Sequence, residues 1–69
     1  MITGYIKFEG KRYFCGRGNT KRTAEAAANW NAQEAARCQG VEYFDVKYTK
    51  NTDAENYPDF TELLTDDNF

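Results

Sequence analysis

The feature that most constrains this chain is a pair of strand-like runs that only two residues separate. Residues 2–8 (ITGYIKF) and 11–16 (KRYFCG) are rich in aromatic and β-branched side chains, and Glu9 and Gly10 lie between them. A two-residue loop that ends in glycine is typical of a tight hairpin turn. The two runs are therefore expected to form neighbouring antiparallel strands.

The register of this hairpin predicts which side chains share a face of the sheet. The expected facing pairs are Phe8 with Lys11, Ile6 with Tyr13, and Gly4 with Cys15. One face is then suited to a core and holds Ile6, Phe8, Tyr13 and Cys15. The other face mixes rings with cations and holds Tyr5, Lys7, Arg12 and Phe14.

A helix with a stripe of small residues is expected to follow the hairpin. Thr20 is a good N-cap, the helix runs from about Lys21 to Cys38, and Gly40 stands where a left-handed C-terminal cap is expected. Small side chains on the buried stripe let such a helix lie close against a sheet. The stripe consists of Ala24, Ala27, Ala28, Asn31, Ala35 and Cys38.

Alternation predicts a third strand over residues 41–48, with Phe44, Val46 and Tyr48 on one face and Tyr43, Asp45 and Lys47 on the other. A polar turn and a short amphipathic helix near the C-terminus follow. The chain is thus expected to be α+β, in the order β-β-α-β-(α), with a small, mainly antiparallel sheet of three strands and the main helix on one face. Residues 1–50 form the core, and 51–69 form an acidic segment of the same single domain.

Trp30 is the unusual residue of the main helix because it lies off the small-residue stripe. The short C-terminal helix would cover it with Phe60, Leu63 and Leu64, which are spaced at i, i+3 and i+4. We favour this arrangement because a chain of 69 residues needs its large apolar side chains in a core. The alternative is an exposed anchor for a partner.

Charge divides the chain into a basic front and an acidic back. Residues 1–40 carry seven basic and three acidic side chains, whereas residues 41–69 carry two basic and eight acidic ones. Such asymmetry points to an electrostatic partner. Because the chain has no histidine and no recognisable metal or cofactor motif, we expect neither an enzyme nor a bound cofactor. No signal peptide or membrane-spanning run is visible, so the expected location is the cytoplasm.

Residues 13–36 contain a segment, FCGRGNTKRTAEAAA, that resembles the C-terminal half of a double-stranded RNA-binding domain. In that family a strand and a G-x-G-x-[ST]-K-[KR]-x-A turn open the last helix, and the basic residues there contact phosphates. The resemblance implies this role for Lys21 and Arg22. Glu25 takes the place of the next basic position of the family pattern. The nucleic-acid-binding hypothesis adds further cations from the hairpin: Arg17, Lys7 and Arg12.

The preferred hypothesis is a small protein-directed inhibitor. In general build the chain resembles the anti-CRISPR and other small proteins with which phages disable host machinery. Its partner would be a nucleic-acid-binding protein complex of the host, met in the host cytoplasm through acidic mimicry of a nucleic acid. The chain itself would be a monomer or a dimer. The side chains expected to contact the partner are Asp53, Glu55, Asp59, Glu62, Asp66, Asp67, Trp30, Tyr5, Phe14 and Tyr43. Direct nucleic-acid binding through Lys21 and Arg22 is the alternative.

Overall fold

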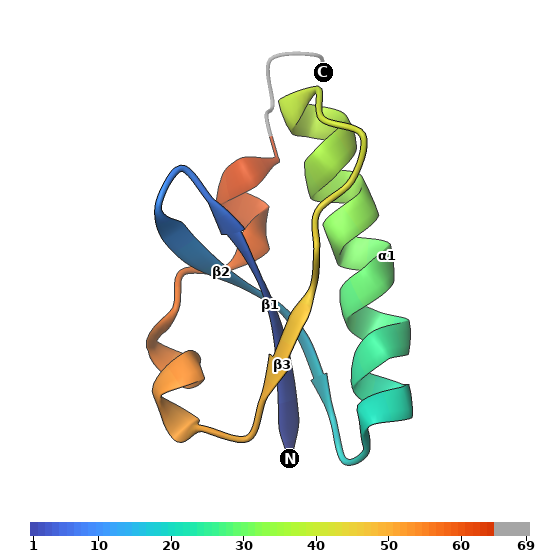
Figure 1. The fold of residues 1–69 in the computed structure, drawn as a ribbon, viewed down its shortest axis with the longest axis vertical. Coiled ribbons are helices and arrows are strands. Elements are labelled where there is room, and N and C mark those ends of the chain that lie inside the picture. Colours follow the sequence, from blue (N-terminus) through green and yellow to red (C-terminus); the bar gives the residue numbers. More distant parts are fainter. Residues whose placement is uncertain (65–69) are drawn as a thin grey trace.

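The computed structural model describes residues 1–64 and has the expected α+β architecture (Figure 1). Three antiparallel strands form a sheet in the order β2-β1-β3, and one long helix packs on one of its faces. The elements are β1 (Ile2–Phe8), β2 (Lys11–Gly18), α1 (Lys21–Gln39) and β3 (Lys47–Thr49), followed by the short 3-10 turns η1 (Thr52–Asn56) and η2 (Phe60–Leu63).

The predicted hairpin is confirmed close to its turn. Glu9 and Gly10 both have positive φ angles, of 51° and 82°, as a two-residue hairpin loop requires. Phe8 pairs with Lys11, and the next pairs along the ladder also follow the prediction as far as Tyr5 and Phe14.

Beyond that point a β-bulge at Cys15 changes the register. Gly4 pairs with Gly16, so the prediction that it faces Cys15 is wrong. The bulge places an extra residue on β2, and the Cys15 side chain is fully buried toward α1. The extra backbone carbonyl is satisfied by a tertiary contact, because the Asn31 side-chain amide of α1 donates a hydrogen bond to it.

Local capping determines where α1 begins and ends. The side chains of Thr20 and Thr23 each accept a hydrogen bond from the other residue's backbone amide. At the other end Gly40 has a φ angle of 73°, and the Val41 amide bonds back to the Ala36 carbonyl. The helix ends one residue later than predicted.

The buried stripe of α1 differs from the predicted one. Ala32 and Ala36 are buried although they were not expected to be, and Ala27, Asn31 and Cys38 are only half-buried. The stripe is displaced because α1 is covered from two sides, by the sheet and by η2. The fully buried helix residues are Ala24, Ala28, Ala32, Ala35 and Ala36.

Near the start of α1 the helix backbone lies directly against the strands. A Cβ atom added at Gly4 would lie 2.7 Å from the Cβ atom of Ala28, and one at Gly16 would lie 3.0 Å from the Ala28 backbone nitrogen. At Gly18 the distance to the Ala24 backbone nitrogen would be 2.6 Å. These glycines are therefore required by the close approach of two backbones.

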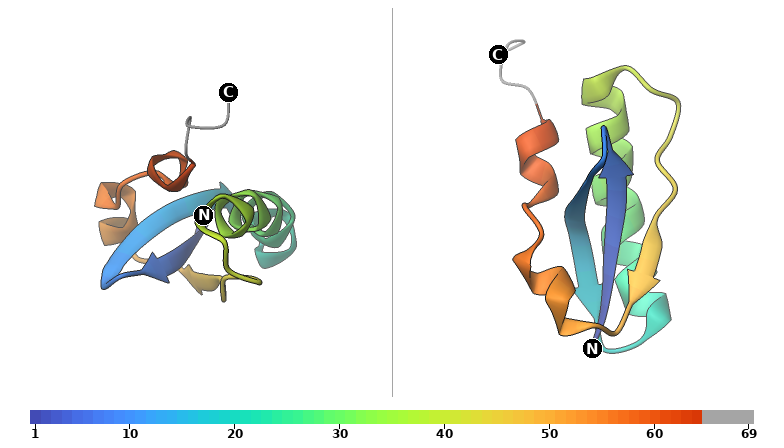
Figure 2. Two further views of the ribbon diagram at one scale, coloured as in Figure 1. Left: turned by 90° about the horizontal axis from the view of Figure 1, so that it is seen from above. Right: turned by 60° about the vertical axis from the view of Figure 1, so that its left-hand side comes forward.

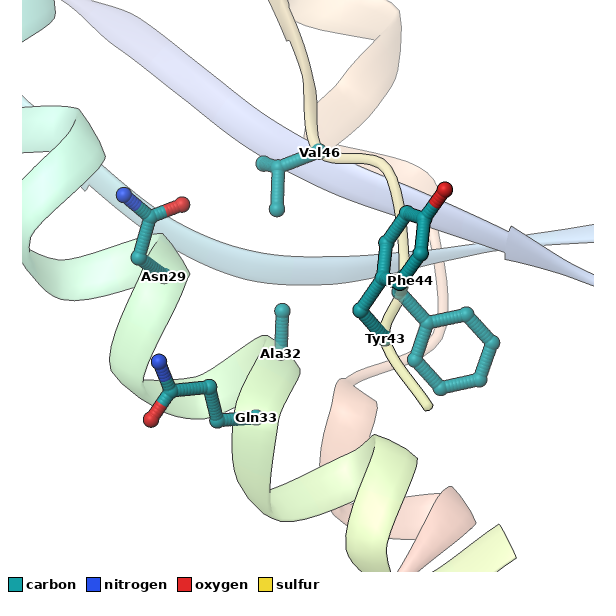
Figure 3. A pocket seen from close by; sticks show the side chains of 6 residues that line it. All are labelled: Asn29, Ala32, Gln33, Tyr43, Phe44 and Val46. Atoms are coloured by element: carbon teal, nitrogen blue, oxygen red, sulfur yellow. The ribbon is translucent and has the colours of Figure 1, made fainter. Parts of the chain in front are cut away.

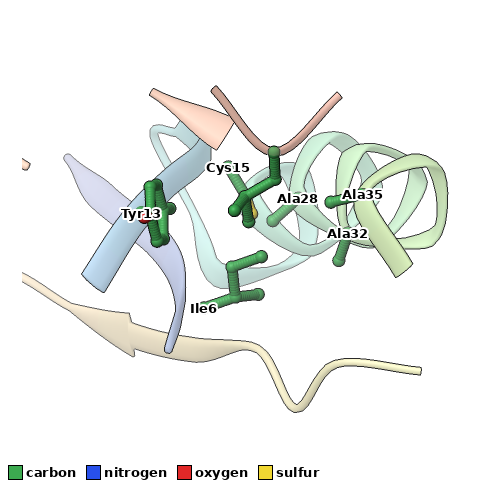
Figure 4. Packing of buried hydrophobic residues seen from close by; sticks show 7 residues of the cluster. Ile6, Tyr13, Cys15, Ala28, Ala32 and Ala35 are labelled. Carbon is green, nitrogen blue, oxygen red and sulfur yellow. The ribbon is translucent and has the colours of Figure 1, made fainter. Parts of the chain in front are cut away.

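Toward the end of α1 larger side chains fill the space between the layers (Figure 4). Ile6, Tyr13 and Cys15 point from the sheet toward the helix, and Leu63 closes the cluster from η2. Half-buried apolar residues surround this core: Phe8, Phe44, Val46, Tyr48, Phe60 and Leu64.

The third strand is shorter than predicted. Only Lys47–Thr49 pair with β1. Residues 41–46 precede this strand and are not paired with β1. The chain leaves α1 in the helix layer and must descend to the sheet, so it joins the ladder late (Figure 1). The predicted alternation nevertheless holds: Phe44, Val46 and Tyr48 are half-buried, and Tyr43, Asp45 and Lys47 are exposed.

The C-terminal tail passes from one face of the sheet to the other around the edge of β2 (Figure 2, right). Tyr57 stacks edge-on against Tyr5 of the face opposite α1, with ring centroids 5.3 Å apart. The Phe14 amide then donates a hydrogen bond of 2.8 Å to the Pro58 carbonyl. Leu63 finally enters the core on the α1 side. The predicted amphipathic helix is only the 3-10 turn η2, and the predicted polar turn contains η1.

Candidate protein-binding surface

A hollow of about 190 Å³ lies between α1 and the segment that leads into β3 (Figure 3). Ala32, Phe44 and Val46 give it apolar walls, and Asn29 and Gln33 add polar groups from the helix. The hollow exists because Ala32 is too small to reach the facing segment where that segment stands away from the sheet. Tyr43 also lines it and is 69% exposed.

Trp30 is 64% exposed, so the prediction that the tail covers it is wrong. The tail packs against another side of α1, where the Gln39 side-chain amide donates a hydrogen bond to the Leu63 carbonyl. Trp30 adjoins Asn29 and lies one turn before Gln33, both of which line the hollow. Trp30 itself is not among the residues that line the hollow.

Trp30, Val41 and Tyr43, together with the hollow, are called the Trp30 surface below. Val41 is 39% exposed and lines a second, adjoining depression with Tyr43. Clustered exposed apolar residues beside a hollow mark interaction sites more often than isolated ones do. Sequence reasoning identified Trp30 and Tyr43 but missed Val41 and the lining of the hollow, because only the fold brings the helix and this segment together.

The other predicted contact residues lie elsewhere. Tyr5 and Phe14 are half-buried on the face opposite α1, under Tyr57 and beside the tail. They do not join Trp30 and Tyr43 in one surface.

The predicted acidic residues follow the tail. Asp53, Glu55 and Glu62 are exposed on η1 and η2, whereas Asp59 is half-buried and accepts a hydrogen bond from the Thr61 amide. The two turns lie along the β2 side of the molecule (Figure 2, right). Asp66 and Asp67 lie outside the described residues.

The predicted basic residues are divided between two places. Lys21 and Arg22 are exposed at the start of α1, where the Lys21 ammonium lies 5.7 Å from the centroid of the Tyr48 ring. On the face opposite α1, the Arg17 guanidinium lies 4.9 Å from the centroid of the Phe14 ring.

The remaining hairpin cations lie further along that face. The Arg12 guanidinium lies 6.0 Å from the centroid of the Tyr57 ring, and Lys7 pairs with Arg12 across the ladder.

Burial changes the pKa of two side chains. Burial, reinforced by the negative charge of Asp59, raises the pKa of the Cys15 thiol to about 12. A thiol held protonated at neutral pH is a poor nucleophile. Burial, followed by the charge of Glu25, also raises the pKa of Tyr48. Within residues 1–64, no three His, Cys, Asp or Glu side chains are grouped so as to hold a metal ion.

Comparisons with protein-family models, with curated proteins and with solved structures find no match to this chain. In the described part of the chain, α1 is too polar to cross a membrane.

Proposed function

We propose that this chain is a small binding protein that acts by contact with another protein. The observation that carries the proposal is the exposure of Trp30 and Tyr43, each about two-thirds accessible, with Tyr43 lining an apolar hollow. Tryptophan and tyrosine dominate the energetics of protein interfaces, especially next to pockets that a partner can fill. A domain this small would bury both rings in its own core unless exposure served a purpose.

The narrower form of the proposal is an inhibitor of the kind that phages direct at host machinery. Its target would be a nucleic-acid-handling complex in the host cytoplasm. The exposed carboxylates of Asp53, Glu55 and Glu62 support this form, because an acidic surface complements a basic nucleic-acid-binding one.

Nucleic-acid binding through Lys21 and Arg22 is the second candidate. Among residues 1–64 the ion pair between Arg37 and Glu34 is the one salt bridge, so no carboxylate of this part of the chain pairs with Lys21 or Arg22. Free cations at an exposed helix start are suited to phosphate contacts.

The test is affinity capture from bacterial lysate with and without nuclease treatment, with bound proteins identified by mass spectrometry. Three variants are compared with the wild type: Trp30→Ala with Tyr43→Ala, Lys21→Glu with Arg22→Glu, and Asp53→Asn with Glu55→Gln and Glu62→Gln. All changed side chains are exposed, so circular dichroism should show the same fold in each. We expect the first variant to lose a discrete protein complex and the second to retain it.

Two results would decide against the proposal, and a third would decide against its narrower form. Retention of every partner by the Trp30→Ala, Tyr43→Ala variant would overturn the Trp30 surface. Partners that disappear after nuclease treatment, and whose capture needs Lys21 and Arg22, would favour nucleic-acid binding. Full retention by the carboxylate variant would remove the mimicry but leave the protein contact.

A further inference from the structure

The two edge strands of the sheet differ in whether another segment of the chain covers them. The edge of β2 is covered by the tail through the Phe14 hydrogen bond to Pro58 and a bridge between Phe14 and Asp59. On the other side, no segment of residues 1–64 pairs with the outer edge of β3. Figure 2 (right) shows β3 and the segment before it at the border of the molecule, away from the tail. An open edge is a template for another strand.

The segment before β3 extends this open edge. Within the described residues, the main chain of residues 42–45 makes no hydrogen bond to another protein group. Its burial alternates as in a strand, with Phe44 turned inward and Tyr43 and Asp45 exposed. Residues 42–50 therefore present extended backbone whose donors and acceptors are free along much of its length.

The charges on this edge are self-complementary. In an antiparallel pair of two copies centred on Val46, Asp45 of one copy lies opposite Lys47 of the other, and Glu42 lies opposite Lys50. Each of the four charged residues in 42–50 then faces an opposite charge on the other copy. Because of the two-fold symmetry, each of these pairs occurs twice in the dimer. The same register places Phe44 opposite the second copy's Tyr48.

We infer that residues 42–50 pair with the same residues of a second copy of this chain, giving a two-fold symmetric dimer with one continuous six-stranded sheet. The charged residues that protect an edge against indiscriminate pairing select this partner and this register. The two-fold axis runs perpendicular to the sheet, so both α1 helices lie on the same face. The inference does not depend on the function of the Trp30 surface.

Substitutions that reverse the charge of Asp45 or Lys47 test the proposed register of the dimer. Asp45→Lys places lysine opposite Lys47, and Lys47→Asp places aspartate opposite Asp45, so each variant repels its own copy. We expect either change to raise the dimer dissociation constant roughly tenfold or more. The double variant Asp45→Lys, Lys47→Asp restores both attractive pairs. A mixture of the two single variants should form heterodimers.

Sedimentation velocity over a range of concentrations, from micromolar to millimolar, measures these equilibria. Amide hydrogen exchange locates the interface, since dimerisation should slow exchange at residues 42–49 and leave residues 11–18 unchanged. Because the side chains of Asp45 and Lys47 are exposed, we do not expect either substitution to unfold the protein. Dimer formation in the mixture would prove that both single variants are folded.

A wild type that remains monomeric at millimolar concentration would overturn the inference. So would a dimer that both single variants keep, or a double variant no tighter than the singles. Protection at residues 29–33 of α1 in place of residues 42–49 would also overturn it, by assigning the dimer to another face.

Discussion

The two ends of the interface between α1 and the sheet hold together in opposite ways. At the start of α1, glycines bring helix and strand backbones into contact, as at Gly4 and Ala28. At the other end, Ile6, Tyr13 and Leu63 fill a wider gap with side chains. At the start of α1 there is no room for an added atom. At the other end the side chains fill the space between the layers, so removing atoms leaves a cavity.

This difference also accounts for the Trp30 surface. The alanines that permit close contact at the start of α1 continue along the helix to Ala32, where the facing segment has left the sheet. Small residues opposite a departing segment leave the hollow of about 190 Å³. One property of the helix thus produces tight packing at one end and a cavity beside the other.

The largest effect is expected from adding a methyl group at the narrow end. In Gly18→Ala the new Cβ atom would lie 2.2 Å from the Thr23 hydroxyl oxygen and 2.6 Å from the Ala24 backbone nitrogen, so the start of α1 must move. Overpacking against backbone should cost about 3 kcal/mol or more, measured by urea unfolding.

The matched control is Gly10→Ala, which meets no atom within 4 Å but has a positive φ angle. Its cost should be about 1 kcal/mol from backbone strain alone. Equal costs for the two variants would contradict the importance of close approach.

The next largest effect is expected from removing atoms at the wide end. Leu63 is 4% exposed, and Leu63→Ala should destabilise the fold by about 2–3 kcal/mol through lost burial and a cavity. Leu63→Met keeps the volume and should cost less than about 1.5 kcal/mol. Urea unfolding measures the free energy of unfolding of both variants. A negligible loss of stability in Leu63→Ala would mean that η2 contributes little to the core.

The Cys15 bulge joins the two ends, and a smaller effect is expected there. Asn31→Leu keeps a side chain of similar size but removes the donor to the Cys15 carbonyl. An unsatisfied, buried carbonyl should cost about 1–2 kcal/mol in thermal or urea unfolding. Exchange of the hairpin amides should also accelerate locally. Unchanged exchange beside the bulge would show that the contact does not hold it in place.

The smallest effect concerns the Cys15 thiol. Because its pKa is about 12 in the folded protein and about 8.5 in an unfolded chain, unfolding releases a proton at alkaline pH. Its stabilising contribution is complete below about pH 8.5 and is lost as the pH rises toward 12. The loss should be about 1 kcal/mol at pH 9. Cys15→Ala should therefore show a shallower alkaline decline of stability than the wild type, and identical slopes would contradict the shift.

Local signals in the sequence predicted the hairpin turn and both caps of α1 correctly. The errors come from contacts between distant segments. The bulge at Cys15 depends on Asn31, sixteen residues away. The shortened third strand reflects the descent from the helix layer to the sheet. The tail avoids Trp30 because Pro58 meets Phe14 at the sheet edge, a pairing for which neither residue gives a sequence signal.

For the candidate site, residue chemistry was more informative than position. Aromatic type identified Trp30 and Tyr43, since large exposed rings are useful to an interface. The hollow that Tyr43 lines depends on the placement of Ala32 against Phe44 and Val46, which only the fold determines. Counting charges likewise found the acidic tail but not its course along the β2 side.

That course has a consequence for how the chain is made. The hairpin and α1 consist of near neighbours and can form as soon as they emerge from the ribosome, whereas Pro58 reaches β2 only after about forty residues beyond that strand have been synthesised. Until then a nascent chain exposes both sheet edges. Chains truncated before Pro58 should consequently be recovered in inclusion bodies, whereas chains that extend to Leu64 should be recovered in the soluble fraction.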